Sequence, residues 1–238
     1  MLMYNKSEAE VVSSNSFQFE NLKSVRNFLY KEVKIAQFDK ILDLGAGDLR
    51  ISKEISQNIR KPVFALDLKT PSKIPENIIF VEGNALNLPF RSHTFDAVAA
   101  SFFFVWIKEI DKAVKEIKRV LKRNGVLIVL SEPLYKKRVC HPESKFNELY
   151  TKGLLKLGAD FEVEETLKKN LLNLGFKIQF KKTQGKRVYS KDEIFEEIDF
   201  LLENNLIDLE TAKFLRLEQK ERDYEIELPI FYGFAFLP

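Results

Sequence analysis

The chain has 238 residues, of which 45% are hydrophobic and 31% charged, and its formal net charge is +3. This length and balance exclude a disordered chain and predict a globular protein with a sizeable core. Cys140 is the only cysteine, which excludes an intramolecular disulfide and fits a reducing compartment. One cysteine and two histidines also leave little material for a metal site, so we expect no metal.

The chain offers no membrane-targeting signal. Its longest apolar stretch, AVAASFFFVWI (97–107), is much shorter than the ~20 residues that span a bilayer. The opening residues, 1–17, lack the continuous apolar core of a secretory signal. We therefore predict a soluble, cytoplasmic protein. Its slight excess of positive charge is too small to indicate a nucleic-acid partner by itself.

The predicted elements begin with a helix, because apolar residues recur at helical spacing ahead of the first strand: Leu22, Val25, Leu29 and Val33. Five apolar runs of strand length follow: KILDL (40–44), VFALD (63–67), IIFVE (78–82), FDAVAAS (95–101) and VLIVLS (126–131). Most of these runs are continuous rather than alternating, which is typical of parallel strands covered on both faces.

Helical patterns separate or follow these strands. One apolar stripe, 113–121, begins after a predicted N-cap, Asp111, and another, 163–174, ends at Gly175. Pro71 and Pro75 indicate that the second and third strands are joined without a full helix. Strands that alternate with helices predict an α/β doubly wound sheet.

The last third of the chain is less regular. A strand is predicted at 176–182 and two acidic helices at 191–205 and 208–222. The final run, IELPIFYGFAFL (226–237), is interrupted by Pro229 and Gly233. These two residues favour one strand at an edge or a bulge of the sheet.

The stretch ILDLGAGDLR (41–50) joins the first strand to a helix through two glycines. Such a turn presents backbone N–H groups at the carboxyl edge of a parallel sheet, where ligands bind. The dinucleotide fingerprint G-x-G-x-x-G fails, because Arg50 occupies its last position. Asp67 ends the next strand about 20 residues beyond the turn, where an acid can accept hydrogen bonds from ribose hydroxyls.

Four motifs in order, ILDLGAGDLR, ALD, FVEGNALNLPFRSHTFDAVAASFFF and LKRNGVLIVLSEP, resemble the class I S-adenosylmethionine-dependent methyltransferases. The likeness covers roughly residues 20–135 and is strongest to the type 11 group, which includes the ubiquinone and menaquinone biosynthesis enzymes. It implies a seven-stranded, mostly parallel Rossmann-like sheet with an antiparallel last strand. It also implies S-adenosylmethionine as cofactor and S-adenosylhomocysteine as product.

The resemblance assigns the glycine turn to the methionine end of the cofactor. Asp43, Gly45, Ala46 and Gly47 are implied to surround it, with Asp43 near the ammonium group and the N–H groups of the turn near the carboxylate. Leu49 stands where the family usually has a third glycine. We expect its side chain to point away from the turn, since leucine is tolerated at the start of a helix. The alternative is that it narrows the cofactor site.

The same resemblance assigns the nucleoside end of the cofactor. Asp67 is implied to bind the ribose and Leu68 to pack beside the adenine. Asn84 and Ala85 are implied to meet the polar edge of the adenine. Asn84 replaces a usual aspartate, and its amide oxygen can still accept a hydrogen bond.

Ser101 and Phe102, after the fourth strand, are implied to lie beside the methionine chain and the sulfonium. The FFFVWI run that starts at Phe102 holds no side chain that can take a proton. Either the acceptor is itself nucleophilic, or a base comes from the segment after the fifth strand. Glu132, Tyr135 and His141 are the catalytic candidates there.

We interpret the chain as one methyltransferase domain with an N-terminal helical cap (1–35), a cofactor-binding core (36–135) and an acceptor side (136–238). The acceptor side contains a helical insertion at 191–222 that serves as a lid or a dimer contact, so the protein is a monomer or a homodimer. The favoured acceptor is a small molecule, and the many aromatic residues suit an apolar one.

Two other functions stay open at this point. Basic clusters at Lys136–Arg138 and Lys181–Arg187 motivate an RNA acceptor, although no RNA-binding module accompanies them. Leu49 and the missing polar residue in the FFFVWI run motivate a non-catalytic module. Such a module would keep the methyltransferase fold and bind only a nucleoside or a partner protein.

Overall fold

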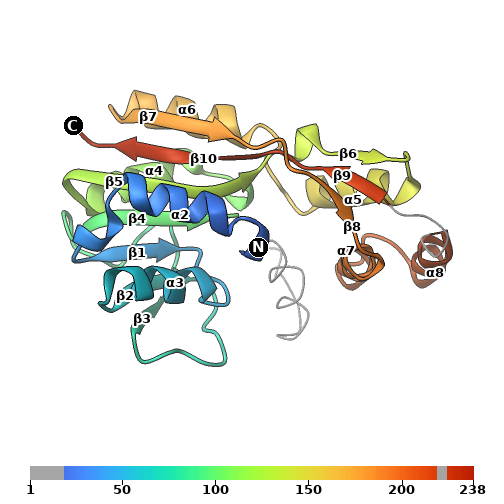
Figure 1. Ribbon diagram of the computed structural model, residues 1–238, viewed down its shortest axis with the longest axis horizontal. Helices are drawn as coiled ribbons and strands as arrows, with labels where there is room; N and C mark the ends of the chain where they lie inside the picture. Colours follow the sequence, from blue (N-terminus) through green and yellow to red (C-terminus); the bar gives the residue numbers. More distant parts are fainter. Residues whose placement is uncertain (1–18, 219–223) are drawn as a thin grey trace.

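A seven-stranded sheet forms the centre of the protein, as the computed structural model shows for the residues that it describes, 19–218 and 224–238 (Figure 1). Its strand order is β3-β2-β1-β4-β5-β10-β7. The strands are β1 (Ile41–Leu44), β2 (Val63–Asp67), β3 (Ile78–Glu82), β4 (Phe95–Ser101), β5 (Leu121–Pro133), β7 (Lys177–Lys182) and β10 (Ile230–Phe236). Only β10 runs antiparallel to its neighbours, β5 and β7, which confirms the predicted fold class.

Helices cover both faces of this sheet. One face carries α2 (Lys23–Glu32), η1 (Ile35–Gln37) and α3 (Arg50–Ile59), and the other carries η2 (Phe104–Trp106), α4 (Ile110–Val120) and α6 (Val163–Asn173). Alternate residues of β4 enter the two cores: Ala97 and Ala99 the first, Val98 and Ala100 the second. Burial on both sides explains why the central strands read as continuous apolar runs.

A second, three-stranded sheet lies beyond the edge at which the parallel strands end (Figure 1). Its order is β6-β9-β8, with β6 (Val139–His141), β9 (Tyr224–Glu227) and β8 (Lys186–Tyr189). The elements around it are η3 (Tyr135–Lys137), α5 (Lys145–Lys156), α7 (Lys191–Glu203) and α8 (Leu209–Glu218). Neither this sheet nor α5 was predicted from the sequence.

The prediction of one strand at 226–237 was wrong. Pro229 has no N–H to donate, and the chain leaves the small sheet there and enters the large one as β10. The carbonyl of Pro229 accepts a hydrogen bond from the N–H of Leu134 at 2.9 Å, which joins the crossing point to the end of β5. Gly233 does lie at an irregularity of the pairing with β5, but the edge strand of the sheet is β7.

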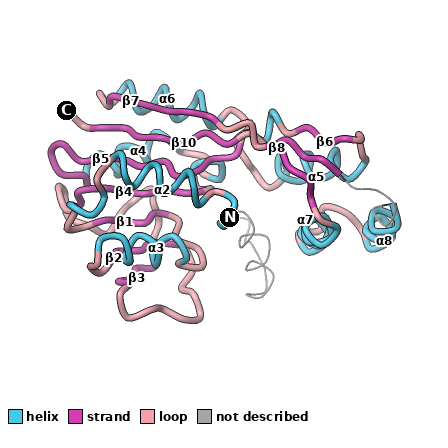
Figure 2. The backbone as a smooth tube through the Cα atoms, viewed as in Figure 1, coloured by secondary structure: helices cyan, strands magenta, loops and turns pink. Residues whose placement is uncertain are grey.

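Smaller details of the prediction also differ. Asp111 does not cap its helix: α4 begins at Ile110, and the Asp111 carboxylate pairs with Lys115 at 3.3 Å. The expected lack of a helix between β2 and β3 is confirmed, and Figure 2 draws this connection as loop. Parts of the predicted cap (1–35) and of the predicted helix at 208–222 lie outside the described residues. Within the described ranges, no helix is long and apolar enough to cross a membrane.

Candidate active site

The glycine turn leaves β1 at the carboxyl edge of the sheet and leads into α3. Gly45 and Gly47 both have positive φ, +73° and +50°, which is a conformation that glycine adopts without steric cost. The N–H groups of Gly45 and Ala46 donate to the carbonyl of Leu66 at 2.9 and 3.1 Å, so the turn is fastened to β2. A Cβ built on Gly47 would meet no atom within 4 Å, so the turn offers open space there.

Asp67, the last residue of β2, lies directly beside this turn. Its Oδ2 accepts a hydrogen bond from the N–H of Gly47 at 2.9 Å. The neighbouring Leu68 is 69% exposed. The structure therefore brings together the glycines and the acid that the sequence analysis assigned to the two ends of one nucleoside ligand.

Leu49 precedes α3 in a left-handed conformation, with φ of +65°. Its side chain is 2% exposed and belongs to the core between the sheet and the α2–α3 layer, together with Leu29 and Ile55. The side chain is therefore packed inside the protein and does not narrow the open space at Gly47. The unusual residue keeps the backbone shape that a glycine would have and adds a core contact.

Asp43 lies beneath the turn with 1% of its surface exposed. Its Oδ2 accepts a hydrogen bond from the hydroxyl of Ser52 at 2.5 Å. Burial raises the pKa of Asp43 to about 7, and the nearby carboxylates of Asp67 and Asp48 raise it as well. A cationic group bound at the turn would stabilise the ionised form of Asp43, so this buried carboxylate suits a ligand with an ammonium group.

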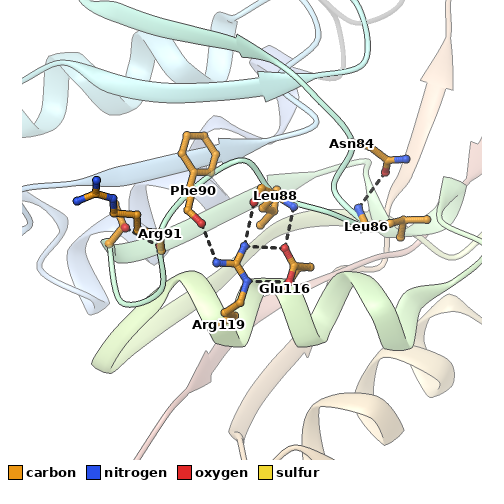
Figure 3. A network of polar contacts seen from close by, with 8 residues as sticks. Asn84, Leu86, Leu88, Phe90, Arg91, Glu116 and Arg119 are labelled. Atoms are coloured by element: carbon orange, nitrogen blue, oxygen red, sulfur yellow. Dashed lines mark hydrogen bonds and ion pairs between the residues drawn. The ribbon is translucent and has the colours of Figure 1, made fainter.

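The loop after β3 is held by two side chains of α4 (Figure 3). Arg119 donates to the carbonyls of Leu88 and Phe90 at 2.9 and 2.7 Å. Glu116 pairs with Arg119 and accepts the N–H of Leu88 at 2.7 Å. This network fixes the segment of chain that follows the two predicted adenine-binding residues.

Those two residues lie at the start of the same loop. Asn84 is exposed, and its side-chain oxygen accepts the N–H of Leu86 at 2.9 Å (Figure 3). Ala85 is 6% exposed. The amide oxygen of Asn84 thus stabilises its own turn.

Ser101 ends β4 next to the end of β5, and Phe102 follows it. The hydroxyl oxygens of Ser101 and Ser131 lie 2.8 Å apart, and the N–H of Phe102 donates to the carbonyl of Ser131 at 2.7 Å. Phe102 has a positive φ of +50°, so the chain turns sharply there. These hydrogen bonds therefore attach the start of the loop to β5.

The three catalytic candidates lie in different surroundings. Glu132 is fully buried at the end of β5, where backbone N–H groups of the loop after β4 donate to it. Tyr135 is 5% exposed, and its ring centroid lies 5.9 Å from that of Phe161. His141 is exposed on β6 and pairs in register with Glu225 of the small sheet.

Residues that the sequence analysis did not single out also build the site. Ser52 binds Asp43, and the Arg119–Glu116 pair supports the loop after β3. Phe103 packs against Gly45, since a Cβ on that glycine would lie 2.5 Å from Cδ2 of the ring. Of these contacts, only the Glu116–Arg119 pair has a spacing, i,i+3, that can be recognised in the sequence. The other contacts join residues that no local spacing links.

The antiparallel strand β10 separates this sheet from the all-parallel dinucleotide-binding folds, while the glycine turn and Asp67 sit where those folds hold a nucleoside. In agreement, residues 42–129 match the family described as a methyltransferase domain. Together with the fold, this match makes the chain similar to the class I S-adenosylmethionine-dependent methyltransferases. The open space at Gly47, the acceptor Asp67 and the buried Asp43 fit the hydroxyl and ammonium groups of this cofactor.

Among curated proteins, the chain is similar to the ubiquinone/menaquinone biosynthesis C-methyltransferase UbiE of Agrobacterium fabrum. They share 38% identity over 104 residues, which are 38% of this chain and 40% of that protein. The mitochondrial arginine-hydroxylase NDUFAF5 of Danio rerio is 32% identical over 111 residues, 42% of this chain and 34% of its own length. The chain therefore spans less than half the length of these relatives.

The likeness to solved structures extends over more of the chain. The crystal structure of the MccD protein superposes with a TM-score of 0.62 and covers 91% of this chain and 97% of that one. Only 14% of the residues are identical, so this comparison supports the fold alone.

Proposed function

We propose that the protein transfers a methyl group from S-adenosylmethionine to a small-molecule acceptor. The observation that carries this proposal is the hydrogen bond between Asp67 and Gly47, which joins the ends of β2 and β1 into one ligand edge. That edge lies inside the segment that matches the methyltransferase family. The bound cofactor supplies a methyl group made electrophilic by the sulfonium, so the protein has to hold it and to exclude water.

The residues of the edge divide this work. The open space at Gly47, above the buried Asp43, receives the methionine end, and Asp67 holds the ribose hydroxyls. Asn84, Ala85 and Leu68 receive the adenine, on the loop that Arg119 anchors to α4. Ser101 and Phe102 flank the reacting end, where the chain turns between β4 and η2.

The acceptor is expected to be small, apolar and itself nucleophilic. Phe102 and Trp106 are only partly buried at this edge, whereas Phe104 lies entirely in the core. Two aromatic rings beside the reacting end suit a flat apolar ring. The curated relative that acts in ubiquinone and menaquinone biosynthesis supports an aromatic acceptor of this kind.

Four cations of the basic clusters that motivated an RNA acceptor are paired with acidic side chains. Lys136 pairs with Glu162, and Arg138 pairs with Glu197 in the interior. In the second cluster, Lys182 pairs with Glu164 at 2.8 Å and Lys186 with Glu225 at 2.7 Å. Paired cations release few counterions from a phosphate backbone, so this surface favours the small-molecule acceptor.

The test is a transfer assay with S-adenosylmethionine labelled in its methyl group. The purified protein is offered hydroxylated aromatic and quinol compounds, total RNA and total protein in parallel, and both S-adenosylhomocysteine and the labelled fraction are measured. We expect label in the organic extract of the aromatic samples. Label in RNA would favour the second acceptor class, and cofactor binding with no transfer in any fraction would favour the non-catalytic module.

A further inference from the structure

The loop after β4 is fastened by one buried carboxylate. Glu132, with none of its surface exposed, accepts hydrogen bonds from three consecutive N–H groups. Its Oε1 lies 2.8 Å from the nitrogen of Phe103 and 3.0 Å from that of Phe104, and its Oε2 lies 3.2 Å from that of Val105. Consecutive N–H groups of this kind form a small anion-binding nest.

Both oxygens of Glu132 are therefore engaged with the backbone. Burial raises the pKa of the carboxyl to about 7, and the three N–H bonds oppose this rise by favouring the charged form. A side chain with no exposed surface and two occupied oxygens does not reach an acceptor molecule. Its contacts act on the loop instead.

The residue at the front of that loop reaches the glycine turn. Phe103 is 9% exposed, and its ring packs edge-on against Phe104 with centroids 5.0 Å apart. A Cβ built on Gly45 would lie 2.5 Å from Cδ2 of the Phe103 ring, closer than atoms can approach. Glycine at position 45 is thus required by the ring as well as by the positive φ of the turn.

We propose that Glu132 is a positioning residue of the cofactor site and that Phe103 is the group it positions. By holding three N–H groups, Glu132 sets the ring of Phe103 against Gly45, where the ring forms a wall of the space for the methionine end. The wall determines how tightly that end is held. This inference rests on the proposed function, because it assumes S-adenosylmethionine at the turn.

The first experiment measures the loop without any ligand. Trp106 is the only tryptophan of the chain and follows Val105 directly, so its fluorescence reports on this loop. We compare wild type, Glu132→Gln and the control Glu143→Gln, whose side chain is exposed in the loop after β6. Glu132→Gln should shift the emission and speed amide exchange at 103–105, while Glu143→Gln should match wild type. Unchanged exchange in Glu132→Gln would overturn the anchoring role.

The second experiment measures S-adenosylhomocysteine binding by calorimetry and methyl transfer by initial rates. Glu132→Gln and Phe103→Leu should each weaken binding about tenfold, and the KM for S-adenosylmethionine should rise more than kcat falls. Phe103→Leu keeps the carboxylate and its bonds, so it tests the wall even if Glu132→Gln does not fold. A fall in kcat with unchanged binding in Glu132→Gln would mean that Glu132 is a base. Unchanged or tighter binding by Phe103→Leu would overturn the wall.

The two proposals fail in different ways. If wild type binds neither S-adenosylmethionine nor S-adenosylhomocysteine, the proposed function fails, and this inference fails with it. If wild type binds both and the two variants bind equally well, only the role of Glu132 and Phe103 is overturned.

Discussion

The carboxylate of Asp67 accepts a hydrogen bond of 2.9 Å from the backbone N–H of Gly47, 20 residues earlier in the chain. Each group belongs to a different strand–loop unit, and β1 and β2 are paired in parallel so that both loops leave from one edge. A ligand that bonds the Asp67 carboxylate therefore lies beside the glycine turn. This juxtaposition is the basis of the proposed nucleoside site.

The stability of Leu49 variants shows how the protein tolerates a side chain at a position where a glycine is usual. Leu49→Ala loses core packing and should cost about 2–4 kcal/mol of unfolding free energy. Leu49→Gly loses the same packing but relieves the left-handed strain at φ of +65°, so it should be about 1 kcal/mol more stable than Leu49→Ala. Urea denaturation of the three proteins checks this order. A Leu49→Ala variant as stable as Leu49→Gly would contradict the strain.

The raised pKa of Asp43 predicts that the stability of the protein depends on pH. Its pKa is raised from 3.8 to about 7, so between these values the folded protein keeps a proton that the unfolded chain has lost. Stability must then fall as pH rises through this window, by up to about 1.4 kcal/mol per pH unit. Asp43→Asn does not titrate, so its stability relative to wild type should improve steadily from pH 5 to pH 7.

The measurement for Asp43 is urea denaturation of both proteins at several pH values. Asp48→Asn, on the same turn, controls for the loss of a negative charge there. Parallel stability curves for wild type and Asp43→Asn would show that the buried carboxyl titrates normally and would contradict the prediction.

The contacts of Arg119 predict that α4 supports the loop after β3, on which the proposed adenine-binding residues lie. Arg119→Ala leaves the carbonyls of Leu88 and Phe90 without their donor, which should cost about 2 kcal/mol of stability. It should also weaken S-adenosylhomocysteine binding, because Asn84 and Ala85 lie on the loosened loop. Thermal unfolding and calorimetry test both effects, with Arg123→Ala, exposed after α4, as control. Equal affinity of Arg119→Ala and Arg123→Ala for S-adenosylhomocysteine would contradict a role of Arg119 in ligand binding.

Arg138 and Glu197 form a buried ion pair on the acceptor side. Their side chains are 1% and 9% exposed, and Arg138 lies 4.3 Å from the ring centroid of Tyr150. Removing one partner leaves an unpaired buried charge, so Glu197→Leu or Arg138→Met should each cost about 3–5 kcal/mol. The double variant should cost clearly less than the sum. Urea denaturation of the four proteins measures this coupling, and additive costs would contradict it.

The large sheet was predictable because its pattern is local. Each central strand is a continuous apolar run, and that pattern follows from burial on both faces, as Ala97 and Val98 show on opposite sides of β4. The small sheet was not predictable in this way. Its strand β6 has three residues and pairs with β9 more than 80 positions later, so no local pattern marks it.

The same difference between local patterns and long-range contacts applies to the residues of the site. The glycine turn and Asp67 have a recognisable spacing, and the structure brings them together. Glu132 was expected as a catalytic candidate because it follows the fifth strand, but its surroundings depend on how β4 and β5 lie side by side. Its hydrogen bonds to the loop, and the contact of Phe103 with Gly45, join segments that only the folded sheet places together.

Calorimetric titration measures which ligand the glycine turn and Asp67 bind. Wild type and Asp67→Ala are titrated with S-adenosylmethionine and S-adenosylhomocysteine, with NAD as a control ligand. We expect micromolar binding of the first two by wild type, a loss of at least tenfold in Asp67→Ala, and no binding of NAD. Absence of binding by a folded wild type, or equal affinity in Asp67→Ala, would contradict the nucleoside site at the glycine turn.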